Sequence, residues 1–234
     1  MTRTCVEPAG DQTVGVRLAS RFNGPPGSAN GGVASGRLAA YVGAPAVEVT
    51  LRRPPPLDVD LRVDAAGGTA RLFDGEHLVA EAVPSTVELE PGPAVDVATA
   101  AATTFAGATG HPFPTCFVCG TDRPDGLRLR PGRLPDGRVA TVWTPADDDP
   151  VMVWAALDCP GGWSADVPGR PMVLGRMAVE RHAPVTPGAP HVVVGWGTGG
   201  EGRKVHTGSA LHDADGRVLA VARATWLVVA PQAD

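Results

Sequence analysis

Long apolar runs, lysine and clusters of basic residues are scarce or missing in this chain of 234 residues. No apolar run reaches the roughly 18–20 residues that a transmembrane helix needs, which argues against a membrane protein. The formal net charge is −5 and no stretch of Lys and Arg stands out. The chain therefore carries no electrostatic footprint for nucleic acid.

Cysteine is also sparse, with four residues. So few cysteines in a chain this long do not make a disulfide framework, and the first residues lack the apolar core of a signal peptide. We therefore expect a cytoplasmic protein with reduced thiols. The length is sufficient for one large domain or for two domains of about 115 residues each.

The hydrophobic pattern predicts a similar order of strands and a helix in each half of the chain. In the first half it predicts a strand, a helix and a series of strands, at residues 13–21, 31–42, 46–53, 57–64 and 69–83. In the second half it predicts two strands, a helix and four strands, at residues 126–130, 138–143, 150–158, 177–181, 191–196, 204–212 and 218–229.

The two halves also match in detail. Residues 47–54 parallel residues 177–184, and residues 70–75 parallel residues 209–216. Residues 91–115 are rich in Pro, Ala and Thr, which is typical of a connector. This predicts an N-terminal domain over 1–90 and a C-terminal domain over 116–234. We expect an α+β pseudo-dimer in which each helix is wrapped by its own curved antiparallel sheet.

A loop rich in glycine and proline, residues 22–30, leads into the first predicted helix. Asn30 is suited to cap this helix, because its side-chain oxygen can accept a free N–H of the first turn. Gly31 and Gly32 leave those N–H groups sterically open, so the helix start can hold a carbonyl oxygen that gains negative charge. The alternative is a capped turn in which the glycines serve only geometry.

Asp158 ends an apolar stretch, residues 154–157, in the second predicted helix. Burying a carboxylate without a partner is costly, so this position indicates either a hydrogen-bonding partner or a chemical role. Pro160, followed by Gly161 and Gly162, predicts that the helix breaks or kinks just after Asp158.

Several motifs resemble those of the hotdog-fold thioesterases of the phenylacetate-degradation type. They are Cys116-Phe117-Val118-Cys119-Gly120, Gly126-Leu127, Asp136-Gly137 and Ala155-Ala156-Leu157-Asp158 in the second half, and Pro25-Pro26-Gly27-Ser28-Ala29-Asn30-Gly31-Gly32 in the first. The resemblance extends over about residues 13–229 and implies a tandem, or double, hotdog fold.

This resemblance implies catalytic roles. In the family, a glycine at the helix start offers its N–H to the thioester carbonyl, and an Asp eight residues further on acts as general base or nucleophile. Gly31 matches the glycine, but Ala39 stands eight residues on; Asp158 matches the acid, but Pro150 stands eight residues back. We therefore predict one composite site from Gly31 and Asp158, with Gly32 as a second donor, and one inactive site.

Asn30 stands where the family has His, and it is assigned to the site only as a positioning residue. Four other residues are assigned to substrate binding. Arg203 and Lys204 follow a glycine-rich turn that in a hotdog borders the groove for the coenzyme A phosphates, although a solvated hairpin end is the alternative. Trp154 is expected to line an acyl pocket or else to lie in the core, and Asn23 belongs to the loop before Gly31.

Cys116 and Cys119 have the C-x₂-C spacing of zinc ligands. A zinc site needs two more ligands, for which His111 and Cys159 are the candidates, and no second pair has zinc-ribbon spacing. We therefore expect two buried thiols at a turn and no metal. Cys159 is also a conceivable nucleophile, although no His has a recognisable relation to it.

Together these features predict an enzyme that hydrolyses an acyl thioester of coenzyme A, or of an acyl carrier protein, without a metal or cofactor. A module that binds an acyl thioester or a small apolar ligand without chemistry is one alternative. A hydratase or dehydratase is another, although that chemistry generally pairs an Asp with a His in one half. The expected partners are the thioester and, in a homo-oligomer, further copies of the chain.

Overall fold

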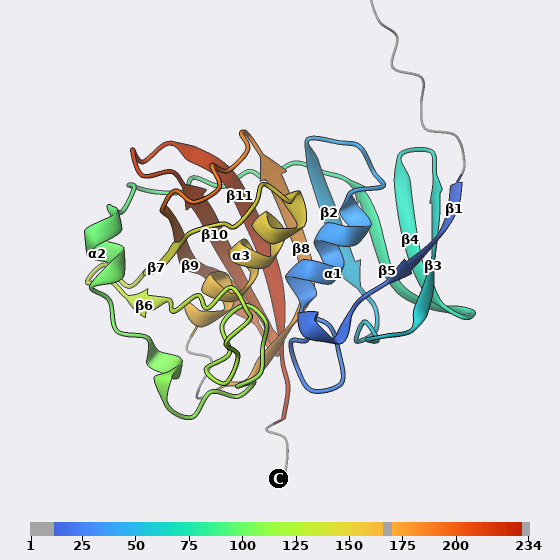
Figure 1. Ribbon diagram of the computed structural model, residues 1–234, viewed down its shortest axis with the longest axis horizontal. Coiled ribbons are helices and arrows are strands. Elements are labelled where there is room, and N and C mark those ends of the chain that lie inside the picture. Colours follow the sequence, from blue (N-terminus) through green and yellow to red (C-terminus); the bar gives the residue numbers. More distant parts are fainter. Residues whose placement is uncertain (1–11, 166–169, 231–234) are drawn as a thin grey trace, which may run out of the picture.

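The computed structural model of the chain describes residues 12–165 and 170–230. Two helices, α1 (Gly31–Ala39) and α3 (Pro150–Trp163), lie side by side across one face of a single curved sheet (Figure 1). The first half contributes five strands, β1 (Gln12–Arg17), β2 (Ala46–Leu51), β3 (Asp60–Ala66), β4 (Thr69–Asp74) and β5 (His77–Pro84). The second half contributes β6 (Gly132–Arg133), β7 (Val139–Trp143), β8 (Met172–Arg181), β9 (His191–Glu201), β10 (Lys204–His212) and β11 (Val218–Val228).

The strand order shows the internal repeat. Within the described residues, eleven strands form one sheet of antiparallel neighbours in the order β1-β3-β4-β5-β2-β8-β11-β10-β9-β7-β6. From the centre outward, the two halves therefore use their strands in the same succession. The two central strands, β2 and β8, pair Val47 with Val179 and Val49 with Met177, within the segments that the sequence repeat aligns. This confirms the tandem α+β arrangement, while the exact domain boundaries stay a prediction.

The strand predicted at residues 126–130 is wrong. Arg128 has a left-handed backbone, with φ of 56°, which interrupts an extended ladder. The N–H groups of Leu127 and Leu129 donate to the carbonyls of Phe117 and Val118 at 2.8 and 2.9 Å. The segment therefore runs along the loop of residues 116–120, called here the cysteine loop, instead of joining the sheet.

The predicted break of the second helix at Pro160 is also wrong. Asp149 caps α3 through the Val151 N–H, but the helix continues through Pro160 to Trp163. The reason is tertiary, because β9 packs directly on the helix backbone. A Cβ added at Gly195 would lie 2.5 Å from the carbonyl carbon of Pro160. Packing of this kind holds the helical backbone where local propensity alone favours a break.

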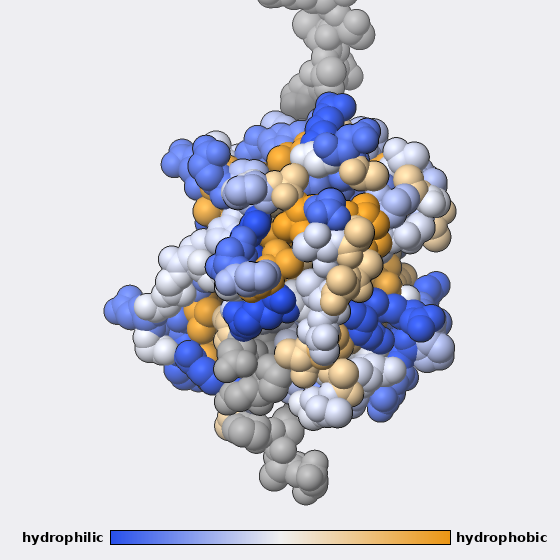
Figure 2. Space-filling model, turned by 90° about the vertical axis from the view of Figure 1, so that its left-hand side faces the viewer, coloured by the Kyte–Doolittle hydropathy of each residue, from blue (hydrophilic) through white to orange (hydrophobic). Residues whose placement is uncertain are grey.

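The connector between the halves covers the outer face of the second half of the sheet. Along β9, Val193 belongs to the main core with α3, whereas Val192 and Val194 face the opposite side. There they pack with residues of the connector, which forms a short helix, α2 (Val97–Ala101). Apolar residues show between polar ones on this side of the molecule (Figure 2). Among the described helices, none is long and apolar enough to span a membrane.

The two helices approach closely because two glycines of α1 face α3. A Cβ added at Gly32 would lie 2.7 Å from the carbonyl oxygen of Trp154 and 2.8 Å from Cβ of Asp158. A Cβ added at Gly36 would lie 3.0 Å from Cβ of Trp154. Any larger residue at position 32 would therefore push the helices apart, and Asp158 with them.

We predict that Gly32→Ala lowers the free energy of unfolding by about 1–3 kcal/mol, because the new methyl group must displace backbone atoms of α3. Gly36→Ala should cost less, since its contacts are longer and the better helix propensity of Ala offsets about 1 kcal/mol. Gly15→Ala is the control, because a Cβ there meets nothing within 4 Å. Urea unfolding measures all three, and equal stability of the Gly32 and Gly15 variants would contradict the packing argument.

Candidate functional site

Asp158 lies at the contact between α1 and α3, and only 2% of its surface is exposed. Its Oδ2 accepts two hydrogen bonds, from Asn30 Nδ2 at 2.8 Å and from the Gly32 N–H at 3.1 Å. Its Oδ1 is buried and has no hydrogen-bonding partner in the part of the chain that the structure describes. One carboxylate oxygen is therefore held in place while the other is left free to accept a proton.

Asn30 performs two tasks at the start of α1. Its Oδ1 accepts the Val33 N–H at 3.0 Å, which makes Asn30 the N-cap predicted from the sequence. Its Nδ2 donates to Asp158 and lies 3.9 Å from the sulfur of Cys116. An amide suits this position because it offers an acceptor and a donor on opposite sides of one small group.

Gly31 is the first residue of α1, so its N–H has no hydrogen-bond acceptor within the helix. The Gly32 N–H is taken by Asp158 and the Val33 N–H by Asn30. Within residues 12–165 and 170–230, no hydrogen bond from the Gly31 N–H is found. Gly31 lines the same pocket as Asn30 and Asp158, so this donor is available to a ligand.

The protonation of Asp158 is tuned by its surroundings. The pKa of its carboxyl group is raised to about 7, mainly by burial and also by the nearby Cys116, while the hydrogen bonds from Gly32 and Asn30 oppose the shift. A carboxyl group with this pKa exchanges its proton readily near neutral pH. That is the property required of a general acid or base.

The pocket beside Asp158 is mostly apolar. Apart from Asn30, Gly31 and Asp158, its walls come from the loop before α1, the cysteine loop, the end of α3, and strands β8 and β11. The large side chains among them are Phe113, Trp163, Met172, Leu174 and Trp226. The pocket is therefore suited to an apolar group whose polar end reaches Asp158 and Gly31.

Some of the predicted site residues meet, and others lie elsewhere. Asn30, Gly31, Gly32 and Asp158 converge as described. The four residues assigned to substrate binding, Asn23, Trp154, Arg203 and Lys204, do not line the pocket.

Each of these four has another environment. Trp154 is buried against Gly36 between the helices. The Asn23 side chain donates to Thr115 at 2.9 Å and accepts from Arg123, which fixes the loop before α1. Arg203 and Lys204 are exposed at the turn between β9 and β10. Their contact with a phosphate stays a prediction.

The apolar wall was not predicted, apart from the general expectation that a tryptophan lines the pocket. Met172, Leu174 and Trp226 lie on strands and resemble core residues in the sequence, so no local signal distinguishes them. His111 was considered only as a metal ligand, yet it lines the pocket and stacks edge-on against Trp163. Burial lowers the pKa of His111 and favours its neutral form.

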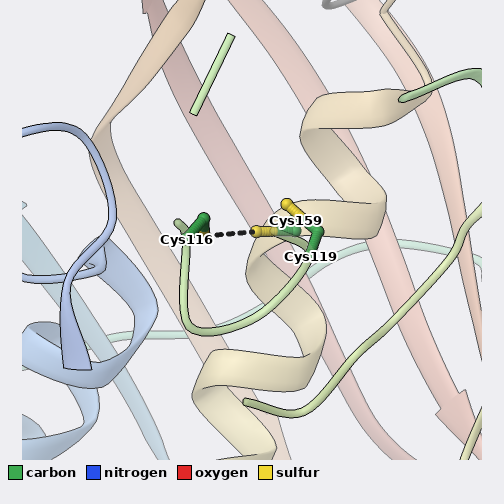
Figure 3. Close-up of side chains that lie close together, drawn as sticks. All are labelled: Cys116, Cys119 and Cys159. Atoms are coloured by element: carbon green, nitrogen blue, oxygen red, sulfur yellow. Dashed lines mark hydrogen bonds between the residues drawn. The ribbon is translucent and has the colours of Figure 1, made fainter. Parts of the chain in front are cut away.

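Three cysteines gather at one wall of the pocket (Figure 3). Cys116 and Cys119 come from the loop at residues 116–120 and Cys159 from α3, and their sulfurs all lie within 4.8 Å of one another. The neighbouring thiols lower the pKa of Cys116, whereas the same contacts raise the pKa of Cys159 well above its ordinary value. A protonated Cys159 does not favour its role as a nucleophile.

No protein-family model and no curated protein sequence matches the chain. Solved structures match it over almost its whole length. A hotdog-fold protein of unknown function from Alicyclobacillus acidocaldarius has a TM-score of 0.65 at 14% identity, covering 94% of each chain. The tesB protein of Mycobacterium avium subspecies paratuberculosis has a TM-score of 0.64 at 12% identity, covering 96% of each chain.

A third structure, the PpsC dehydratase domain of Mycobacterium tuberculosis in complex with C12:1-CoA, has a TM-score of 0.60 at 16% identity. The match covers 94% of this chain and 95% of that domain. Other structures of this fold carry the name thioesterase. At these identities the likeness establishes the fold, and the chain is a double-hotdog protein.

We predict that Asn30→Asp destabilises the fold at pH 8 by about 2 kcal/mol or more, because a second carboxylate then faces Asp158 in place of a donor. The loss should shrink at pH 5, since one proton shared between the two carboxyl groups restores a hydrogen bond. Asn30→Ser is the control, because it keeps a capping oxygen without adding charge. Urea unfolding at both pH values measures the effect; an Asn30→Asp variant as stable as wild type at pH 8 would refute the contact.

Proposed function

We propose that this protein hydrolyses an acyl thioester at the pocket between α1 and α3. The observation that supports this most strongly is the arrangement around Asp158. Two donors hold its Oδ2, and its Oδ1 has no partner among the described residues. Gly31, whose N–H likewise has no acceptor in that part of the chain, lines the same pocket. The addition of water to a carbonyl group needs a general base for the water and a donor for the carbonyl oxygen, and these residues can supply both.

The reaction follows from this arrangement. The thioester carbonyl oxygen accepts the Gly31 N–H, and the positive end of the α1 dipole adds to its polarisation. Asp158 Oδ1 takes a proton from a water molecule as the water oxygen bonds to the carbonyl carbon. The tetrahedral intermediate then collapses, the carbon–sulfur bond breaks, and the sulfur leaves as a thiolate. The proton held by Asp158 returns to the products, which are a carboxylic acid and a thiol.

The substrate class rests on the pocket and on the fold. Aromatic and aliphatic walls are suited to an acyl chain or an aromatic acyl group. A structure of the same fold holds an acyl-coenzyme A, and others carry the name thioesterase. We therefore favour a coenzyme A thioester with an apolar acyl group, and an acyl carrier protein as the second source of the thioester.

One observation supports a second candidate, the hydration or dehydration of an acyl thioester. His111 lines the same pocket as Asp158, a combination that the sequence did not lead us to expect. However, His111 Nδ1 accepts the Phe113 N–H at 2.9 Å, so in the neutral ring the proton lies on Nε2. His111 is then a donor and lacks the free base that proton abstraction requires.

Thiol release from acetyl-, hexanoyl-, phenylacetyl-, benzoyl- and palmitoyl-coenzyme A tests the proposal. We expect turnover of at least one thioester with an apolar acyl group, and a fall in kcat of about 100-fold or more for Asp158→Asn, because the isosteric amide cannot take a proton. Asp148→Asn is the matched control, since Asp148 is exposed just before the same helix. It should retain wild-type activity.

Three results would count against the proposed hydrolysis or against the role of Asp158 in it. Full activity of Asp158→Asn would remove Asp158 from the chemistry. Tight binding of an acyl-coenzyme A with no thiol release over hours would instead identify a binding module. Conversion of an enoyl thioester to a hydroxyacyl thioester, with the thioester bond left intact, would favour the hydratase.

A further inference from the structure

Three of the four cysteines of the chain meet in one cluster, although the loop and the helix that carry them are far apart in the sequence. The Cys116 and Cys159 sulfurs lie 3.9 Å apart (Figure 3). All three residues are buried, with 4–7% of their surfaces exposed. Burial of cysteine as a small apolar residue does not require the sulfurs to converge, so the convergence itself needs an explanation.

The loop that carries Cys116 and Cys119 is tightly folded. The Gly120 N–H donates to the Cys116 carbonyl at 2.8 Å, and a Cβ on Gly120 would lie 2.5 Å from the Cys116 nitrogen. Only glycine fits there without moving the loop. Arg130 donates to the carbonyls of Cys119 and Gly120 at 2.8 and 3.0 Å. Its guanidinium group places a positive charge beside the sulfurs, which favours thiolates.

We infer that Cys116, Cys119 and Cys159 form a binding site for a zinc ion with three thiolate ligands. Zinc binds thiolates at about 2.3 Å in a tetrahedral arrangement, which places two sulfur ligands about 3.8 Å apart. The Cys116–Cys159 distance of 3.9 Å matches this value, and the third sulfur lies within 4.8 Å of both. Small rotations of the Cys119 side chain complete the triangle.

The proton balance of metal binding is simple. Each zinc–sulfur bond that forms on a thiol releases its proton to solvent, so binding requires no oxidant. A disulfide between Cys116 and Cys159 would require the removal of two electrons by an oxidant. Three thiolates and a divalent zinc ion leave one net negative charge, which Arg130 is placed to offset.

The fourth position of the ion is exchangeable. His111 is close, but its Nδ1 accepts a backbone N–H, so Nε2 carries the proton and has no lone pair for a metal. Since all three cysteines line the pocket, the fourth ligand is a small molecule from that pocket, such as water. The proposed hydrolysis uses Asp158 and Gly31 and does not require the ion. The ion fastens the cysteine loop to α3, next to Asp158.

Zinc content and cobalt spectra test this site without any substrate, so the result does not depend on the proposed activity. The full chain is purified under reducing conditions, supplied with zinc and dialysed against a weak chelator before elemental analysis. We expect one zinc ion per chain in wild type and in Cys5→Ser, a control cysteine outside the described residues. Cys116→Ser, Cys119→Ser and Cys159→Ser should each lose the ion.

If these variants do not fold, cobalt substitution of the wild-type protein still tests the site. Bound Co²⁺ should give sulfur-to-metal charge-transfer absorption and the strong visible bands of a tetrahedral site. His111→Gln should keep both features, and a small added thiol should shift the visible bands by taking the fourth position. Wild-type protein that binds neither metal after full reduction would overturn the site. Visible bands that do not respond to the thiol, or that are lost in His111→Gln, would overturn the open fourth position.

Discussion

The close approach of α1 to α3 is the constraint on which the rest of this structure depends. Gly32 and Gly36 present no side chain at the contact, so backbone meets backbone between the two halves of the chain. This lets the Gly32 N–H reach a carboxylate on the other helix at 3.1 Å. The same contact brings Asn30 within 2.8 Å of that carboxylate. The candidate site therefore combines Asn30, Gly31 and Gly32 from the first repeat with Asp158 from the second.

The cost of burying Asp158 explains much of the local chemistry. The carboxylate is almost fully enclosed, and its two donors only partly offset the desolvation that raises its pKa to about 7. The three cysteines lie along the same wall, and Asn30 contacts both Asp158 and Cys116. Asp158 and the three cysteines thus form one polar region in an otherwise apolar pocket.

The catalytic roles of Asn30, Gly31, Gly32 and Asp158 stay a prediction, but the sequence alone was sufficient for the repeat, most strands and the N-cap at Asn30. These depend on periodicity, on capping residues and on motif spacing, all of which are local. It was not sufficient for the continuation of α3 through Pro160, because packing of β9 and β11 decides that helix. It also missed the apolar wall, and it named Cys159 only as one candidate for a further zinc ligand beside Cys116 and Cys119. Such features arise only when distant segments meet, and nothing local marks them.

The most direct test of the composite site is the carbonyl stretching frequency of a ¹³C-labelled acyl thioester bound to the protein. Asp158→Asn is used to slow turnover, and Gly31 is changed to Ala or to Pro in that background. Both changes add a Cβ against Leu174, but only proline removes the N–H. Proline is otherwise well tolerated at the first position of a helix. Our account predicts a lower frequency than in water with Ala, and a return toward the water value with Pro. Equal frequencies in the two variants would show that the Gly31 N–H does not hold the carbonyl.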